Sequence, residues 1–261
     1  MDSSPRTLSL CAGIGGLDLG IQLALPGSRT VCFVERDAFA CEVLAHQMEE
    51  GGLDQAPVWT DLRTFDGTAW RGCVDLIAAG YPCQPFSVAG QRQGEDDERH
   101  LWPEVHRIIG EVRPSLVILE NVPGHIRLGF ERVLADLAGL GFDAEWATVR
   151  ASDVGSCHRR ERLFVVGYSN RTGLQGWHGP QRQGAHELPS WPPGPTGDWS
   201  SIPRGLWPAT PQPKLRGVDD AGQSPDRMDP HRDRIDRLRC LGNAVVPQQA
   251  ALAIRHLLAR I

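Results

Sequence analysis

Short apolar strands alternate with amphipathic helices through the first two-thirds of this chain, and this alternation limits the fold more than any other feature. The strand-like segments are TLSLCAGIGG (7–16), TVCFVER (30–36), VDLIAAGYP (74–82), PSLVILENVPG (114–124) and ERLFVVGYS (161–169). The segments with helical spacing are LDLGIQLAL (17–25), DAFACEVLAHQMEE (37–50), HLWPEVHRIIGEV (100–112) and FERVLADLAGLGF (130–142). Such a series predicts an α/β protein whose mostly parallel sheet has helices on both faces.

The alternation stops at about residue 170. From there to residue 226 the chain is rich in Gly, Pro, Ser and Trp and shows no sustained period of 2 or 3.6. The segment contains four tryptophans, more than a solvated linker usually carries, so we expect a small irregular insert. A turn and a C-terminal helix are expected within DRLRCLGNAVVPQQAALAIRHLLARI (236–261). We therefore divide the chain into residues 1–169, 170–235 and 236–261.

The seven cysteines bear on which chemistry the chain can carry. Their number is odd, their spacing is scattered, and the sequence contains neither a C-x-x-C pair nor a Cys/His cluster at zinc-ligand spacing. This argues against a disulfide framework and against a structural metal. The sequence also lacks an apolar run of the ~20 residues that span a membrane, and lacks a basic leader. We expect a cytoplasmic protein without metal.

Charge is distributed unevenly along the chain. The formal net charge of −5 by itself argues against a nucleic-acid binder. Residues 1–150 carry 12 basic and 22 acidic side chains, whereas residues 151–240 carry 13 basic and 10 acidic ones. All basic residues except Lys214 are arginine, whose planar fork suits phosphates and base edges. A coding bias toward arginine explains the same observation equally well.

Three groups at predicted strand ends outline one pocket. The turn Gly13-Ile14-Gly15-Gly16 follows the first strand, Glu35 follows the second, and Asp61 follows a short third one. Ligands of parallel sheets bind at the carboxyl ends of the strands. There, an acidic residue after the second strand typically accepts hydrogen bonds from ribose hydroxyl groups. Asp61 could accept a hydrogen bond from an adenine amino group. Each feature alone could be structural, but together they predict a nucleoside site, and the lack of a P-loop lysine excludes a triphosphate.

A second group of reactive side chains is predicted at the same edge. Cys83 follows the strand 74–82, Glu120 and Asn121 end the strand 114–121, and Arg160 and Arg162 open the strand 161–169. On its own Cys83 could be a buried apolar residue, a metal ligand, half of a disulfide or a nucleophile. The cysteine pattern weakens the second and third of these interpretations.

The motifs that surround these residues occur in a specific order. They are LCAGIGGLDLG (10–20), ERDAFACEVL (35–44), TDLRTF (60–65), GYPCQPFSVAGQRQGEDDERHLWPE (80–104), LENVPG (119–124), CHRRERLFVVG (157–167) and LGNAVVP (241–247). In this order they resemble the DNA (cytosine-5) methyltransferases along nearly the whole chain, in particular the compact phage- or prophage-like bacterial members. The resemblance implies the Rossmann-like fold of S-adenosylmethionine-dependent methyltransferases, with residues 170–235 as a small target-recognition insert.

The resemblance also implies roles at the base-binding edge. The Cys83 thiolate adds to C6 of a flipped-out cytosine, and Glu120 binds the N3/N4 edge and favours protonation there, for which its pKa should be raised. Arg162 binds the O2 side with support from Arg160, and Asn121 orients the adjacent backbone. The closing loop, residues 84–100, contributes the expected DNA contacts Gln84, Ser87, Gln91 and Arg99.

The cofactor implied by the resemblance is S-adenosyl-L-methionine. Its expected pocket consists of Gly13, Ile14, Gly15, Gly16, Glu35, Asp61, Gly80, Leu101, Asn243 and Ala244. The implied partner is double-stranded DNA, which the protein meets as a monomer, and a cognate restriction endonuclease is a further candidate partner.

The chain departs from the family pattern at three places. Cys11 stands where a phenylalanine is usual, His158 replaces a glutamine, and the R-x-L-T-x-R-E segment expected before LGNAVVP is missing. Two alternatives remain open: a tRNA cytosine-5 methyltransferase, whose usual Cys-Phe-Thr tripeptide is not found here, and an inactive DNA-binding relative.

Overall fold

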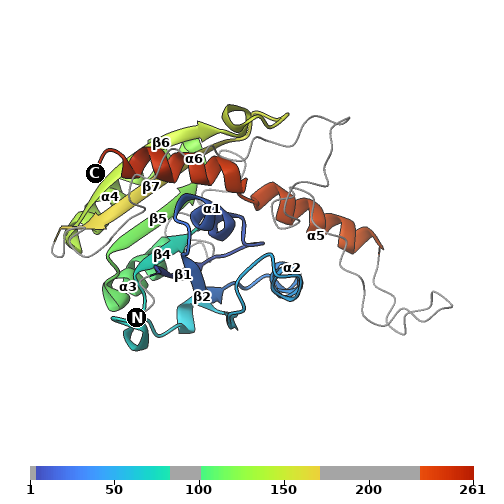
Figure 1. Ribbon diagram of the computed structural model, residues 1–261, viewed down its shortest axis with the longest axis horizontal. Helices are drawn as coiled ribbons and strands as arrows, with labels where there is room; N and C mark the ends of the chain where they lie inside the picture. Colours follow the sequence, from blue (N-terminus) through green and yellow to red (C-terminus); the bar gives the residue numbers. More distant parts are fainter. Residues whose placement is uncertain (1–3, 83–100, 171–229) are drawn as a thin grey trace.

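The computed structural model describes residues 4–82, 101–170 and 230–261, with side chains described from residue 234 in the last range (Figure 1). Several predicted site residues lie outside these ranges, namely Cys83, Gln84, Ser87, Gln91 and Arg99, as does most of the predicted insert.

A seven-stranded sheet in the order β3-β2-β1-β4-β5-β7-β6 forms the centre of the molecule. Its strands are β1 (Arg6–Leu10), β2 (Arg29–Val34), β3 (Val58–Trp59), β4 (Leu76–Ala79), β5 (Leu116–Asn121), β6 (Phe142–Arg150) and β7 (Glu161–Ser169). The pairs from β3 to β5 are parallel, whereas β7 runs antiparallel to both β5 and β6. The predicted α/β fold with a mostly parallel sheet is confirmed.

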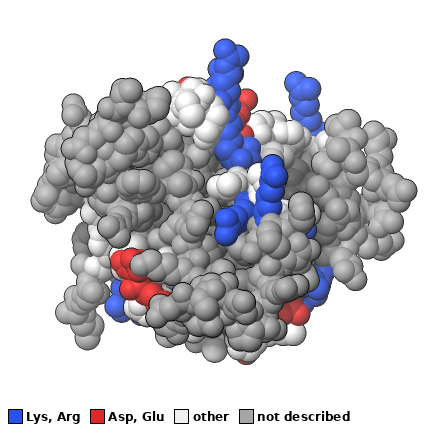
Figure 2. Space-filling view, turned by 90° about the vertical axis from the view of Figure 1, so that its right-hand side faces the viewer, with Lys and Arg blue, Asp and Glu red and all other residues white. Residues whose placement is uncertain are grey.

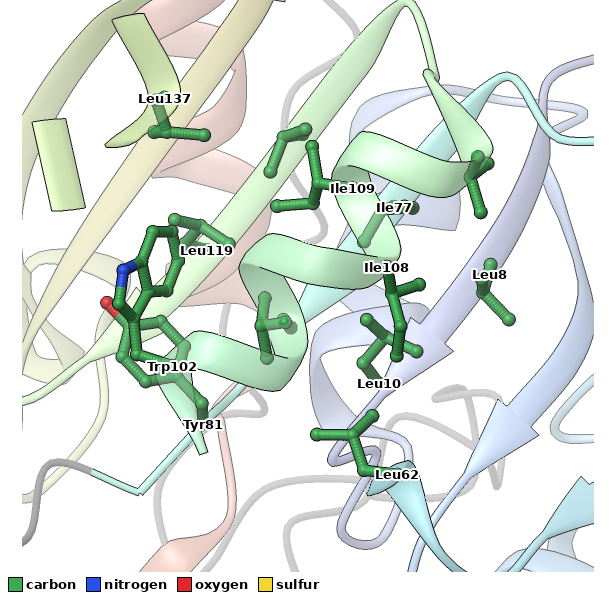
Figure 3. Close-up of a cluster of buried hydrophobic side chains, with 14 of the residues drawn as sticks. Leu8, Leu10, Leu62, Ile77, Tyr81, Trp102, Ile108, Ile109, Leu119 and Leu137 are labelled. Carbon is green, nitrogen blue, oxygen red and sulfur yellow. The ribbon is translucent and has the colours of Figure 1, made fainter. Parts of the chain in front are cut away.

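Helices cover both faces of the sheet because its buried strands are apolar on both sides. On one face α3 (Trp102–Val112) and α4 (Phe130–Gly139) cover Ile77 and Leu119, and Figure 3 shows α3 side chains packed on these strands. On the other face α1 (Gly16–Ala24) and α6 (Pro247–Leu258) lie side by side over Leu76 and Ile118. Helix α2 (Ala38–Glu49) packs against Phe33 of β2.

Two parts of the fold differ from the sequence-based expectation. Strand β6 was not predicted, because an edge strand that pairs only with β7 can carry charged residues such as Asp143 and Glu145 and has no continuous apolar run. The segment before the C-terminal turn is also helical: α5 (Pro230–Asn243) spans the boundary drawn at residue 235 and projects from the body in Figure 1.

Among the residues that the structure describes, none of the helices is long and apolar enough to cross a membrane. The described ranges likewise contain no group of three or more His, Cys, Asp or Glu side chains placed to hold a metal ion.

Candidate active site

Glu120 and Arg162 form a largely buried ion pair at one edge of the sheet. Arg162 Nε lies 2.9 Å from Glu120 Oε1, and their side chains are only 14% and 9% exposed. Glu120 stands near the end of β5, and Arg162 near the start of β7. Because these strands are antiparallel, the start of β7 lies beside the end of β5, so the two predicted residues meet.

Burial changes the acidity of the Glu120 carboxyl. Removal from water raises its pKa to about 7, although the positive charges of Arg162 and Arg160 and the hydrogen bond from Arg162 act in the opposite direction. A carboxyl with this pKa exists in both protonation states near neutral pH. It can therefore donate a proton to a ligand or accept one from it.

Arg160 lies in the same region but makes different contacts. Its Nη2 donates to the carbonyl oxygen of Gly242 at 2.6 Å, and its Nη1 donates to that of Leu241 at 3.4 Å. Burial lowers the pKa of Arg160, and the neighbouring Arg162 charge lowers it further. Arg160 therefore influences Glu120 through its charge while its guanidinium binds the last turn of α5.

Asn121 connects the end of β5 to the end of β4. Its Nδ2 donates to the carbonyl oxygen of Tyr81 at 3.0 Å, and its Oδ1 accepts from the backbone N–H of Val122 at 2.8 Å. Tyr81 is two residues before Cys83 in the chain. The Asn121 side chain is therefore hydrogen-bonded to backbone groups at both strand ends, and its orienting role stays a prediction.

A buried tyrosine–histidine pair fixes the same strand end from the other side. Tyr81 Oη lies 3.0 Å from His125 Nε2, and His125 Nδ1 lies 2.8 Å from the carbonyl oxygen of Leu128. Since a carbonyl can only accept, Nδ1 carries a proton, and in the neutral ring Nε2 accepts from the tyrosine hydroxyl. The Tyr81 ring packs on Trp102 (Figure 3). This pair is not predictable from the sequence, because no spacing rule brings residues 81 and 125 together.

Gly80 lies between the base-binding group and the cofactor group. A Cβ placed at Gly80 would lie 3.6 Å from both Glu120 Oε2 and the Cys11 carbonyl oxygen. Cys11 precedes the glycine turn of the predicted cofactor pocket. The two predicted groups are therefore neighbours at one edge of the sheet.

The glycine turn after β1 is tied directly to the acid after β2. Glu35 Oε2 accepts from the Gly13 N–H at 2.7 Å, and Oε1 accepts from the N–H groups of Arg36 and Asp37. Gly13 has a φ of +56°, and nothing lies within 4 Å of a Cβ placed there. The turn therefore leaves open space beside a carboxylate, which is the arrangement that a ribose-bearing ligand requires.

The remaining predicted cofactor residues have different surroundings. Asp61 caps the short helix Leu62–Thr64 by accepting from the Arg63 N–H at 3.0 Å. Leu101 packs against the core beneath α3. Ile14 follows Gly13 in the same glycine turn.

The C-terminal motif returns to the glycine turn. Asn243 and Ala244 precede Val245, whose carbonyl oxygen lies so close to Gly16 that a Cβ on Gly16 would clash with it. The predicted C-terminal part of the cofactor pocket is therefore next to the predicted N-terminal part.

Among the described residues, exposed arginine side chains lie at the end of the molecule that carries α5. Figure 2 looks onto this end and shows described arginine side chains at its centre, with acidic side chains at its margins. The exposed arginines of this region include Arg159, Arg234 and Arg239. Of these, Arg239 also approaches Asp37 and Asp236 at 3.6 Å.

Comparison with known proteins gives a consistent result. Residues 5–193 match the family model described as C-5 cytosine-specific DNA methylase. The chain is 36% identical over 168 residues to the Type II methyltransferase M.NgoMIV of Neisseria gonorrhoeae, a match that covers 63% of this chain and 52% of that protein. It is 35% identical over 165 residues to M.CviJI of Paramecium bursaria Chlorella virus IL3A, covering 62% and 42%. The aligned part thus spans about half the length of these relatives.

Solved structures give the same fold. A candidate DNA modification methyltransferase encoded within an E. coli prophage aligns with 64% of this chain and 47% of its own, at 27% identity and a TM-score of 0.53. The DNMT2 of Spodoptera frugiperda aligns with 64% of this chain and 50% of its own at a TM-score of 0.54. At 22% identity this match shows the fold alone.

Proposed function

This chain belongs to the C-5 cytosine-specific DNA methylase family, and from this premise we propose that it transfers a methyl group from S-adenosyl-L-methionine to C5 of a flipped-out cytosine in double-stranded DNA. The observation that carries the proposal is the buried Glu120–Arg162 pair, with a Glu120 pKa of about 7, beside the strand end that leads to Cys83.

The hydrogen-bond acceptors and the open space around the glycine turn fit S-adenosylmethionine. The open space at Gly13 adjoins the Glu35 carboxylate, which suits ribose hydroxyls, and Asp61 follows the next strand as an acceptor for the adenine amino group. Asn243 and Ala244 complete this pocket from the C-terminal side, and Leu101 and Gly80 line it. When bound, the cofactor supplies an electrophilic methyl group.

Side chains of this protein activate the target cytosine for methyl transfer. Cytosine C5 is a poor nucleophile, so the Cys83 thiolate first forms a bond to C6 and Glu120 gives a proton to N3, which turns C5 into an enamine-like carbon. C5 then takes the methyl group, whose bond to the sulfonium sulfur would break, so that S-adenosylhomocysteine would leave. Loss of the C5 proton to a base restores the C5–C6 double bond and breaks the bond between C6 and sulfur, which returns Cys83 as a thiolate. The Glu120 carboxylate takes the proton back from N3.

The neighbouring side chains hold the base and the nucleophile in register. Arg162 binds the O2 side of the ring and lowers the proton affinity of Glu120, so that both states of the carboxyl remain accessible. Asn121 holds the Tyr81 carbonyl and with it the start of the Cys83 segment. C6 is inaccessible in stacked DNA, so the base must leave the helix.

Two other cysteines near the cofactor group, Cys11 and Cys240, are poorly suited to act as nucleophiles. Burial raises the pKa of Cys11 to about 12 and that of Cys240 to about 11, which keeps both as neutral thiols.

DNA recognition is assigned to the described arginines around α5 and to residues 84–100 and 170–235. The arginines around α5 supply phosphate contacts, residues 170–235 read the target, and Gln84, Ser87, Gln91 and Arg99 contact the DNA from the closing loop. The protein acts as a cytoplasmic monomer of bacterial or phage origin. The similarity to Type II methyltransferases favours a cognate restriction endonuclease as partner.

The test is a transfer assay with methyl-labelled S-adenosylmethionine on double-stranded DNA and on tRNA, followed by sequencing that maps 5-methylcytosine. Cys83→Ala should abolish transfer, and Cys73→Ala, which changes an exposed cysteine elsewhere, should not. Transfer to tRNA alone would favour the RNA-modifying alternative. Undiminished transfer by Cys83→Ala, or no transfer to either polymer, would overturn the proposal.

A further inference from the structure

Arg160 links the base-binding edge to the C-terminal segment through three hydrogen bonds. Its two terminal nitrogens donate to the carbonyl oxygens of Leu241 and Gly242, at the last turn of α5. Its own carbonyl oxygen accepts from Gln249 Nε2 at 2.8 Å. Gln249 is fully buried in α6, and the same Nε2 donates to the carbonyl oxygen of Val149 at 2.6 Å. Arg160 is therefore hydrogen-bonded to both α5 and α6, the helices on either side of the C-terminal turn.

The position of that turn matters for the cofactor pocket. Asn243 is the last residue of α5 and Ala244 begins the turn that leads to α6, and the carbonyl oxygen of Val245 in this turn lies against Gly16. The last carbonyls of a helix have no partner within the helix and carry partial negative charge. A guanidinium is well suited to fix them, because its fork can bind two carbonyls at once.

From these contacts we infer that Arg160 is a positioning residue for the cofactor pocket and not a second ligand of the target base. It holds the end of α5 and the turn that follows, which carry Asn243 and Ala244, next to Gly16, while Arg162 alone of the two arginines contacts Glu120 among the described ion pairs. This inference rests on the proposed use of S-adenosylmethionine. It separates the functions of two arginines that are only two residues apart.

The experiment compares Arg160→Met with Arg162→Met in the full chain. Calorimetric titration with S-adenosylhomocysteine should show affinity about tenfold weaker for Arg160→Met, the equivalent of one lost charge-assisted hydrogen bond. Arg162→Met should bind it within about twofold of the unsubstituted protein, and Arg159→Met, at an exposed neighbouring position, should bind it equally well. The affinity of Arg160→Lys, which keeps the charge but loses the forked guanidinium, should lie between that of Arg160→Met and that of the unsubstituted protein.

A second measurement needs no ligand. Amide hydrogen exchange over residues 241–246 should become about tenfold faster in Arg160→Met and stay unchanged in Arg162→Met. Equal exchange and equal affinity in both variants would overturn the inference. If the unsubstituted protein does not bind S-adenosylhomocysteine, the proposed function fails, and the exchange data still decide whether Arg160 holds the turn.

Discussion

Glu120 accepts a 2.9 Å contact from Arg162 in a site from which most water is excluded, and yet its pKa is raised to about 7. Burial thus outweighs the attraction of two arginines. In the free enzyme the carboxyl loses its proton as pH rises through about 7, so a reaction that needs a proton from Glu120 slows above that pH. We expect kcat/KM to show a falling limb near pH 7.

Removal of Arg162 should move that limb. Because the Arg162 charge lowers the pKa of Glu120, Arg162→Gln should raise this pKa and shift the falling limb of kcat/KM to higher pH, while the overall rate drops. The pH profile of methyl transfer, measured at constant ionic strength, checks this. A limb that stays in place would show that another group titrates there.

Glu120→Gln should remove the proton donor without leaving a cavity. We expect methyl transfer to fall by about 10²–10⁴-fold, the usual contribution of a positioned acid or base. Urea unfolding should show that the variant is folded. Retention of more than a tenth of the activity would exclude Glu120 as the donor.

The Tyr81–His125 contact should be measurable as a coupling energy. Tyr81→Phe removes the hydroxyl next to His125 Nε2 and should lower the free energy of unfolding by about 1 kcal/mol. In a double-mutant cycle with His125→Leu, the effects should be non-additive by about 0.5 kcal/mol or more. Additive effects, measured by urea unfolding of all four proteins, would contradict the contact.

Gly16→Ala should disturb the junction between the two ends of the chain. The added methyl group clashes with the Val245 carbonyl oxygen, so we expect a loss of about 1–3 kcal/mol in unfolding free energy and weaker binding of S-adenosylhomocysteine. Gly139→Ala is a matched control, since nothing lies within 4 Å of its Cβ and alanine favours the helix that it ends. Thermal unfolding and titration of both variants test the difference.

Asp18 should make stability depend on pH. It is buried in α1 and accepts from the Ser9 and Thr30 hydroxyls, and burial raises its pKa to about 6. The folded protein thus holds this proton more tightly than the unfolded chain. Its contribution to stability is complete below about pH 4 and is lost as pH rises through about 6.

Asp18→Asn removes this titration. The unfolding free energy of the unsubstituted protein, minus that of Asp18→Asn, should fall by about 2 kcal/mol between pH 4 and pH 6.5. Urea titrations of both proteins across this range provide the measurement. A constant difference would mean that Asp18 is not the titrating group.

The sequence alone determined the α/β architecture and the residue types at each strand end. Apolar runs such as 74–82 and 114–121 bury both faces of a strand whatever lies beside them, so they can be read locally. Ordered motifs likewise predicted Glu35 in the cofactor pocket, and Glu120 and Arg162 together at the base-binding edge. The role of Cys83 remains a prediction from those motifs.

Only the tertiary structure decided how these groups meet. The reversed direction of β7 places Arg162 beside Glu120, and the position of α5 places its last carbonyl oxygens on Arg160. The Tyr81–His125 pair arises in the same way. Each of these contacts joins residues far apart in the chain, so their geometry depends on strand order and packing, which no local pattern encodes.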